Sequence, residues 1–341
     1  RLPERRVEYA RVHRVHGEID RAGAVAPEKD LLPRRAAVAR AENAAVGIGP
    51  EGVAEDGDVN QVRVGRVDAD RSYLARATEA GVWKTTDGGM TWLPVSDAFF
   101  GTLHEAGHGI YGQGLDPGHF GTPMGSPVGL GIHESQSRLY ENFVGRSLPF
   151  WKHLMPRARK CFPRALGRVG LEDLYFAVND SKPSFIRVEA DEATYNLHII
   201  LRFEMEQALI NDGLKVADVP GAWNERFRKL FGLKVPDAAR GCLQDVHWSG
   251  GGLGYFPTYT LGNLYAAQFF RTADRELGGL ESQIAAGEFA PLKKWLNQKI
   301  HRQGKRHRSG KLCEAITGEP LTHRYLMEHL KAKFEELYGL Q

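Results

Sequence analysis

The five residues from His104 to His108 constrain the fold of this chain more than any other stretch of its sequence. They read His-Glu-Ala-Gly-His, and two histidines four positions apart lie on one face of an α-helix, a turn apart. On that helix both imidazoles can bind one zinc ion, while Glu105 is close enough to take a proton from the water that the zinc acidifies. The pattern therefore predicts a metal-binding helix with His104 and His108 as ligands and Glu105 as the general base.

The flanking residues favour a helix that is followed by a loop and then by a second helix. Residues 115–131 are rich in proline and glycine, which predicts an irregular connection, and a helical pattern resumes near Ile132. A catalytic zinc takes three protein ligands, so Glu134 is the candidate for the third. The alternative is that Glu134 is only a carboxylate favoured by the helix dipole. Apolar or small residues line the first helix and glycines offer a stop: Phe99, Phe100, Leu103, Gly107, Ile110, Gly112 and Gly114.

Four segments resemble, in the same order, the motifs of a known family. They are 104–108, 132–138 (Ile-His-Glu-Ser-Gln-Ser-Arg), 186–191 (Ile-Arg-Val-Glu-Ala-Asp) and 241–248 (Gly-Cys-Leu-Gln-Asp-Val-His-Trp). Together they resemble the carboxypeptidase Taq family of zinc metallocarboxypeptidases. The resemblance covers about residues 96–341 and extends to short segments near the C-terminus: 295–296, 300–301, 317–321 and 338–340.

The resemblance implies a mainly α fold, a helical half-domain of the gluzincin type of metallopeptidase, preceded by a short irregular or β segment. It implies a metal-dependent carboxypeptidase that removes single residues from peptide C-termini. Zn²⁺ would be held by His104, His108 and Glu134, although His and Glu ligands also suit Co²⁺ or Mn²⁺. Apolar periodicity independently predicts helices over residues 191–210, 263–272, 292–300 and 322–338.

Four residues are candidates for substrate binding, and the resemblance implies the first of them, Arg187. Arg187 would bind the free carboxylate of the substrate, because a guanidinium fork matches two carboxylate oxygens. His247 would contact the substrate or the transition state, and Tyr255 and Tyr259 would line the cleft and donate a hydroxyl. Each has a structural alternative: an ion pair for Arg187, a satisfied core histidine for His247, and packing for the tyrosines.

Other polar residues near these motifs receive supporting roles. Asp245 is expected to orient an imidazole from behind. The glycine-rich stretch 249–254 lacks the Lys-Ser/Thr pair of a phosphate-binding loop, so we expect it to let the backbone turn tightly. Four histidines lack the spacing to join the zinc and are expected to be structural: His119, His133, His153 and His198.

The N-terminal part of the chain does not share the resemblance. Family members are about twice as long as the matching region, and their N-terminal half and Asp-Pro-Phe motif are absent here. Residues 81–92 instead resemble the Asp-box turn of sialidase-like and sortilin-like β-propellers, which predicts a stranded β-hairpin fragment over residues 61–95, without a glycan-binding role. Residues 1–60 are rich in arginine and alanine and are expected to be a disordered leader. We therefore expect a partial or chimeric product.

Composition narrows the possible partners. The chain has 45 Lys and Arg against 42 Asp and Glu, and interleaved acids prevent a basic stripe, so no nucleic-acid partner is expected. No apolar run is long enough for a membrane span. The three cysteines are too few for a disulfide framework, which favours a reducing, cytoplasmic location. The implied partners are peptide substrates and, from the family's dimeric habit, a possible second copy of the chain.

Three hypotheses of function follow. The first is a zinc carboxypeptidase. The second is a metal-binding but inactive fragment, because the absent half would have formed the opposite wall of the cleft. The third is a zinc endopeptidase, which shares every metal residue and lacks only the carboxylate-binding arginine.

Overall fold

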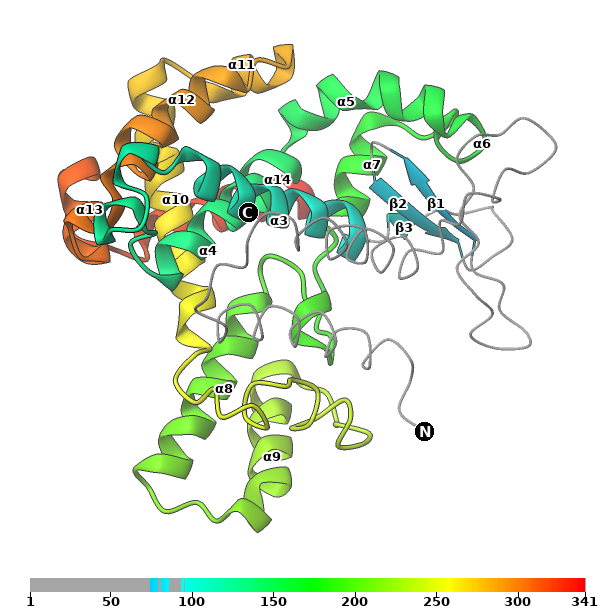
Figure 1. The fold of residues 1–341 in the computed structure, drawn as a ribbon. Helices are drawn as coiled ribbons and strands as arrows, with labels where there is room; N and C mark the ends of the chain where they lie inside the picture. The colour runs from blue at the N-terminus through cyan, green and yellow to red at the C-terminus, as the bar shows by residue number, and fades with distance from the viewer. Residues whose placement is uncertain (1–73, 79–80, 86–92, 95, 341) are drawn as a thin grey trace, which may run out of the picture. The chain divides into compact units, whose positions relative to one another are not determined.

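The computed structural model of the chain describes residues 74–78, 81–85, 93–94 and 96–340, and the mainly α expectation is confirmed (Figure 1). The chain divides into two units, residues 1–92 and 93–341, which are described separately. In the first unit, β1 (Leu74–Thr78) pairs antiparallel with β2 (Gly81–Thr85), with Leu74 opposite Thr85. The expected leader over residues 1–60 and the Asp-box turn at 86–92 lie outside the described residues.

The second unit opens with the short strand β3 (Leu93–Pro94) and the helix that carries the two histidines, α3 (Ser96–Gly114). This helix ends at a glycine, as its sequence predicts. Two 3₁₀ turns with proline at their first positions, η2 (Pro117–His119) and η3 (Pro123–Gly125), form the irregular connection. The second helix, α4 (Leu130–Arg138), continues directly into a π-helical turn, η4 (Leu139–Gly145).

The rest of the unit is a series of helices. α8 begins four residues later than predicted, because the Asp191 carboxylate accepts hydrogen bonds from the amides of Ala193 and Thr194 and holds this segment in a turn. The remaining elements are α5 (Leu148–Cys161), α6 (Pro163–Leu166), α7 (Leu171–Val178), η5 (Arg187–Glu189), α8 (Tyr195–Ile210), η6 (Val216–Asp218), α9 (Val219–Phe231), α10 (Pro257–Leu277), α11 (Leu280–Ala286), α12 (Ala290–Lys299), η7 (His301–Arg306), α13 (Ser309–Thr317) and α14 (Arg324–Tyr338). None of the helices in the described part is long and apolar enough to cross a bilayer.

α4 packs between α3 and α10, and glycines allow both neighbours to approach it closely. A Cβ atom added at Gly107 of α3 would lie 2.5 Å from the carbonyl oxygen of Gln136 and 2.6 Å from Cα of Ser137. A Cβ atom added at Gly262 of α10 would lie 2.3 Å from Cγ of Glu134. The position of Glu134 therefore requires that residues 107 and 262, on the two neighbouring helices, have no side chain.

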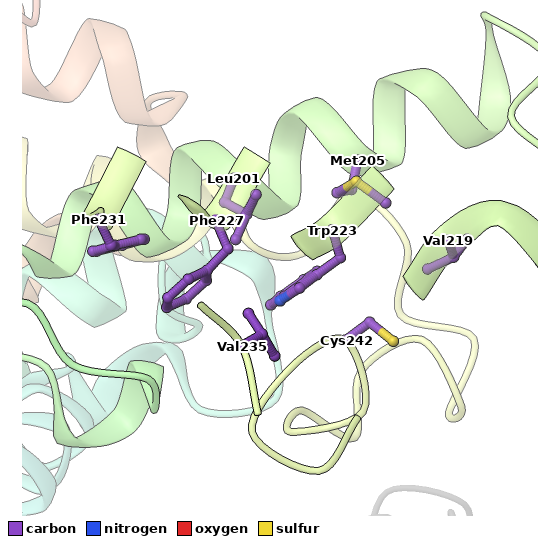
Figure 2. Packing of buried hydrophobic residues seen from close by; sticks show 8 residues of the cluster. All are labelled: Leu201, Met205, Val219, Trp223, Phe227, Phe231, Val235 and Cys242. Carbon is purple, nitrogen blue, oxygen red and sulfur yellow. The ribbon is translucent and has the colours of Figure 1, made fainter. Parts of the chain in front are cut away.

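An apolar cluster joins α8 to α9, which lie side by side (Figure 1). Figure 2 shows the buried members of this cluster: Leu201, Met205, Val219, Trp223, Phe227, Phe231, Val235 and Cys242. Because Cys242 belongs to the 241–248 segment, the cluster also holds that segment against α8. Nε1 of Trp248 donates to Glu206 of α8 over 2.9 Å and fixes the other end of the segment.

The close approach at Gly107 gives a first testable prediction. We expect Gly107→Ala to lower the free energy of unfolding by about 1–3 kcal/mol, because the new methyl group must displace the backbone of α4. Gly109→Ala on the same helix is the matched control. Nothing lies within 4 Å of a Cβ atom there, so it should be neutral or stabilising by up to about 1 kcal/mol. Urea titration measures both, and equal effects of the two substitutions would contradict the prediction.

Candidate active site

The structure brings together the three residues predicted to bind a metal. His104 and His108 project from α3 and Glu134 from α4, and one ligand atom of each lies within 4.8 Å of the other two. Oε2 of Glu134 is 3.7 Å from Nε2 of His104 and 3.6 Å from Nε2 of His108. A tetrahedral zinc ion with bonds of about 2.0–2.1 Å has ligand atoms about 3.3 Å apart. Two imidazole nitrogens and one carboxylate oxygen at this spacing therefore fit a divalent metal ion.

Arg138 fixes the orientation of the Glu134 carboxylate. Its Nε donates to Oε1 of Glu134 over 2.9 Å, which leaves Oε2 facing the two histidines. Its Nη1 donates to Oε2 of Glu141 over 3.1 Å, and the ring of Tyr195 lies 4.1 Å from its Cζ atom. Although burial lowers it, the pKa of Arg138 is raised overall by Tyr195 and the two carboxylates, so the side chain stays charged.

Two residues to which the sequence assigned no role at the metal site contact the histidines on the side that faces away from Glu134. Nδ1 of His104 is 2.9 Å from Oε2 of Glu141, and Nδ1 of His108 is 2.6 Å from Nδ1 of His133. Glu141 follows Glu134 by seven positions and Arg138 by three, so the three residues share one helical stripe, a signal that the sequence contains. His133 was expected to be structural; it stays outside the group of metal-binding atoms but contacts one of its members.

Burial favours the neutral form of two imidazoles here, those of His108 and His133. Burial, together with the charges of His104 and His133, lowers the pKa of His108 to about 3. Burial also lowers the pKa of His133, which the charge of Glu105 partly opposes. Glu105 itself is exposed on α3. Burial therefore favours an unprotonated His108, as a metal ligand requires.

Arg187 makes the ion pair that the sequence left open as an alternative. The residue is only 4% exposed, and its Nε and Nη2 donate to Oδ1 of Asp245 over 3.0 and 2.7 Å. Its Nη1 donates to the hydroxyl of Tyr195 over 2.9 Å. A guanidinium has five N–H groups, and these bonds use three of them. The pair therefore orients Arg187 without using its full capacity for hydrogen bonds.

Asp245 was expected to orient an imidazole, but its hydrogen bonds are to two arginines instead. Its Oδ2 accepts a hydrogen bond of 2.6 Å from Nε of the buried Arg202, and Nδ1 of His247 is 3.9 Å from Oδ1. Burial raises the pKa of Asp245, but Arg202 and Arg187 outweigh it and lower the value to about 2. Asp245 is therefore a carboxylate that holds two guanidinium groups.

The other predicted substrate-binding residues lie around Arg187. Nε2 of His247 is 2.9 Å from the Tyr259 hydroxyl, and the Tyr259 ring is 4.7 Å from Cζ of Arg187. The rings of His247 and Tyr255 are 5.3 Å apart, and Tyr255 is 36% exposed. Burial raises the pKa of Tyr259, so its hydroxyl remains protonated at neutral pH.

Tyr195 connects the metal-binding cluster with the Arg187 cluster. Its ring contacts Arg138, and its hydroxyl accepts the hydrogen bond from Arg187. The negative charge of Glu134 also contributes to the raised pKa of Tyr259. A sharp turn follows His247, with φ of +77° at Gly251 and at Gly254, which agrees with the turn expected from the glycine-rich stretch. Seven of the eight predicted site residues thus belong to two clusters that Tyr195 connects, and the eighth, Glu105, lies on α3 next to His104.

Comparison with known proteins assigns the chain to a family. Residues 90–334 match the carboxypeptidase Taq (M32) metallopeptidase family, which confirms the resemblance seen in the sequence. The chain belongs to the M32 metallopeptidases. The possible Asp-box in the N-terminal segment is not addressed by these matches and stays a prediction.

Curated carboxypeptidases are similar to about 70% of the chain. Thermostable carboxypeptidase 1 of Thermus thermophilus is 55% identical over 240 residues, which are 70% of this chain and 47% of the relative. Carboxypeptidase 1 of Bacillus subtilis is 44% identical over 243 residues, 71% of this chain and 48% of the relative. The chain therefore spans about half the length of the curated relatives it matches.

Solved M32 structures share the fold. The M32 carboxypeptidase from Deinococcus radiodurans superposes with a TM-score of 0.71 at 44% identity, over 72% of this chain and 50% of that structure. The carboxypeptidase of Pyrococcus furiosus gives a TM-score of 0.67 at 38% identity, over 70% of this chain and 48% of that structure. As a metallopeptidase of this family, the chain is expected to bind a divalent metal ion, and the His104, His108 and Glu134 cluster provides a possible site.

Proposed function

We propose that this chain carries the catalytic half of a zinc-dependent carboxypeptidase, which removes single residues from peptide C-termini. The observation that supports this most is the pairing of two clusters through Tyr195. One cluster offers His104, His108 and Glu134 to a metal ion, and the other presents the oriented guanidinium of Arg187. Zinc is the proposed ion because two imidazoles and one glutamate are ligands of known catalytic zinc sites.

The proposed reaction assigns separate roles to the metal ion, Glu105 and Arg187. When bound, the ion acts as a Lewis acid and makes water reactive near neutral pH. Glu105 takes a proton from the attacking water and later gives it to the leaving amine. Arg187 binds the C-terminal carboxylate of the peptide through its remaining N–H groups.

His247, Tyr255 and Tyr259 complete the proposed substrate site. The hydrogen bond between His247 and Tyr259 fixes both side chains, so that a donor faces the carbonyl oxygen as negative charge develops on it. Tyr255, which is partly exposed, lines the cleft. Asp245 does not touch the peptide but holds Arg187 in place.

A pair of short peptides tests this proposal. The purified chain is stripped of metal with a chelator and then supplied with Zn²⁺ or Co²⁺. We expect metal-dependent release of single residues from a peptide with a free C-terminal carboxylate and none from the amidated peptide. Arg187→Ala should lower kcat/KM for the free peptide about 10- to 100-fold, the value of hydrogen bonds to a charged group. The thermal midpoint of the variant serves as its folding control.

Two other outcomes point to the other hypotheses. If both peptides are cleaved internally and Arg187→Ala affects them equally, the endopeptidase hypothesis replaces the proposal. If the chain binds one metal ion and releases nothing, it is a metal-binding fragment without turnover. The second hypothesis draws support from the extent of the match, which covers about half the length of the curated relatives.

Peptides are the proposed partners, and a homodimer and a cytoplasmic location stay predictions. The homodimer rests on the resemblance to the family alone, and sedimentation equilibrium of the purified chain tests it. The location rests on the cysteines, which are all free in the structure: Cys161, Cys242 and Cys313.

A further inference from the structure

Each histidine of the α3 pair has a hydrogen-bonding partner on the side that faces away from Glu134. For His104 the partner is a carboxylate oxygen, Oε2 of Glu141, 2.9 Å from Nδ1. For His108 the partner is a second imidazole nitrogen, Nδ1 of His133, 2.6 Å away. Both Nε2 atoms lie on the other side, 3.6–3.7 Å from Oε2 of Glu134. The two rings are therefore held from behind by different chemical groups.

These contacts select one tautomer of each ring. A neutral imidazole carries its hydrogen on one nitrogen and a lone pair on the other. If Nε2 of His104 directs its lone pair toward a metal ion, Nδ1 carries the hydrogen and donates it, and the Glu141 carboxylate is an acceptor. For His108 the same reasoning makes Nδ1 of His133 the acceptor, so that His133 carries its own hydrogen on Nε2. The observed contacts are consistent with this assignment at both rings.

Both partners are themselves held in place. Glu141 lies in the π-helical turn after α4, where it accepts a hydrogen bond from Arg138 and has Nη2 of Arg146 3.9 Å from Oε1. The ring of His133 packs against the buried Tyr111, with ring centres 5.1 Å apart. The Tyr111 hydroxyl is fixed by a hydrogen bond of 3.0 Å from the amide of Val128. Neither partner can turn away without breaking contacts of its own.

We propose that Glu141 and His133 are positioning residues, which fix the tautomer and the ring orientation of His104 and His108 for metal binding. The inference rests on the proposed metal site. Partners of this kind typically contribute 10- to 100-fold to metal affinity in metalloproteins, because a ring without a partner is free to rotate or to place its hydrogen on the wrong nitrogen. The affinity of the chain for a divalent ion thus depends on residues that never touch the ion.

The decisive experiment compares substitutions that keep or remove an acceptor. In His133→Asn the amide oxygen takes the place of Nδ1, whereas His133→Leu keeps bulk and removes the acceptor. Glu141→Gln keeps an acceptor oxygen and removes its charge. The metal-free full-length chain and each variant are titrated with Zn²⁺ in competition with a chromogenic chelator, and with Co²⁺ while its visible spectrum is recorded. The thermal midpoint of the metal-free protein is measured in parallel.

We expect His133→Leu to weaken Zn²⁺ binding about 10- to 100-fold and Glu141→Gln about tenfold, with an altered Co²⁺ spectrum in both. His133→Asn should stay within about threefold of the wild type. His119→Leu, at an exposed histidine outside the cluster, is the matched control and should leave the affinity unchanged.

Several results would overturn the inference. If His133→Asn and His133→Leu weaken binding equally, His133 acts through packing alone. If all variants bind Zn²⁺ as tightly as the wild type, neither residue positions a ligand, while the proposed metal site stands. If the wild-type chain itself binds no Zn²⁺, the proposed function fails together with the inference. Because Glu141 and His133 support different rings, failure of one variant to fold leaves the other to decide.

Discussion

Glu105→Gln should lower the rate of peptide hydrolysis about 10²- to 10⁴-fold, the usual contribution of a general base. Glutamine has nearly the same shape as glutamate but cannot accept a proton at neutral pH. Glu105 is exposed and lies outside the cluster of His104, His108 and Glu134, so the substitution should leave the ligand atoms in place. The measurement is the initial rate of release of the last residue from an unblocked peptide, at saturating Zn²⁺.

The control for this experiment is the affinity of the Glu105→Gln variant for Zn²⁺. We expect Glu105→Gln to bind Zn²⁺ within about threefold of the wild type, because it removes no ligand and no partner of a ligand. The loss should appear in kcat, since the proton is transferred only as the reaction proceeds. A variant that keeps most of its activity would show that another group is the base. A variant that loses Zn²⁺ would show that Glu105 belongs to the metal site itself.

Local sequence patterns predicted the elements that carry the metal cluster. Helix geometry alone places His104 and His108, four positions apart, on the same face. The helix ends at Gly114, because glycine has a low helix propensity whatever the rest of the fold. The second helix starts at Leu130, two residues before the predicted position. The helix expected from residue 263 begins at Pro257, because proline suits the first turn of a helix and places Tyr259 inside it.

Contacts between distant segments could not be predicted in this way. Arg202 lies in an apolar stripe of α8 that reads as core, and nothing nearby in the sequence shows that its partner is Asp245. The contact between His133 and His108 exists because α3 approaches α4 closely at Gly107, which is a property of packing and not of spacing. Family resemblance identified Asp245 as part of a motif, but the guanidinium groups that it binds became visible only in three dimensions.

Asp245→Asn should cause a large loss of stability. The Asp245 carboxylate lies between the buried guanidinium groups of Arg187 and Arg202, with His247 at 3.9 Å. Removing one member of a buried charge network leaves uncompensated charges, which typically costs about 3–5 kcal/mol. We expect a decrease of this size in the free energy of unfolding at pH 6, measured by urea titration. Asp237→Asn, at an exposed pair with Arg240, is the matched control and should change little.

The pH dependence of the same measurement tests whether charge is the cause. The pKa of Asp245 is lowered from 3.8 to about 2 in the folded chain. A group with a lowered folded pKa stabilises the fold above its unfolded pKa and loses that contribution as the pH falls from about 4 toward 2. The advantage of the wild type over Asp245→Asn should therefore shrink by about 2 kcal/mol over this range. An advantage that stays constant with pH would mean that the shape and hydrogen bonds of Asp245, and not its charge, hold Arg187 and Arg202.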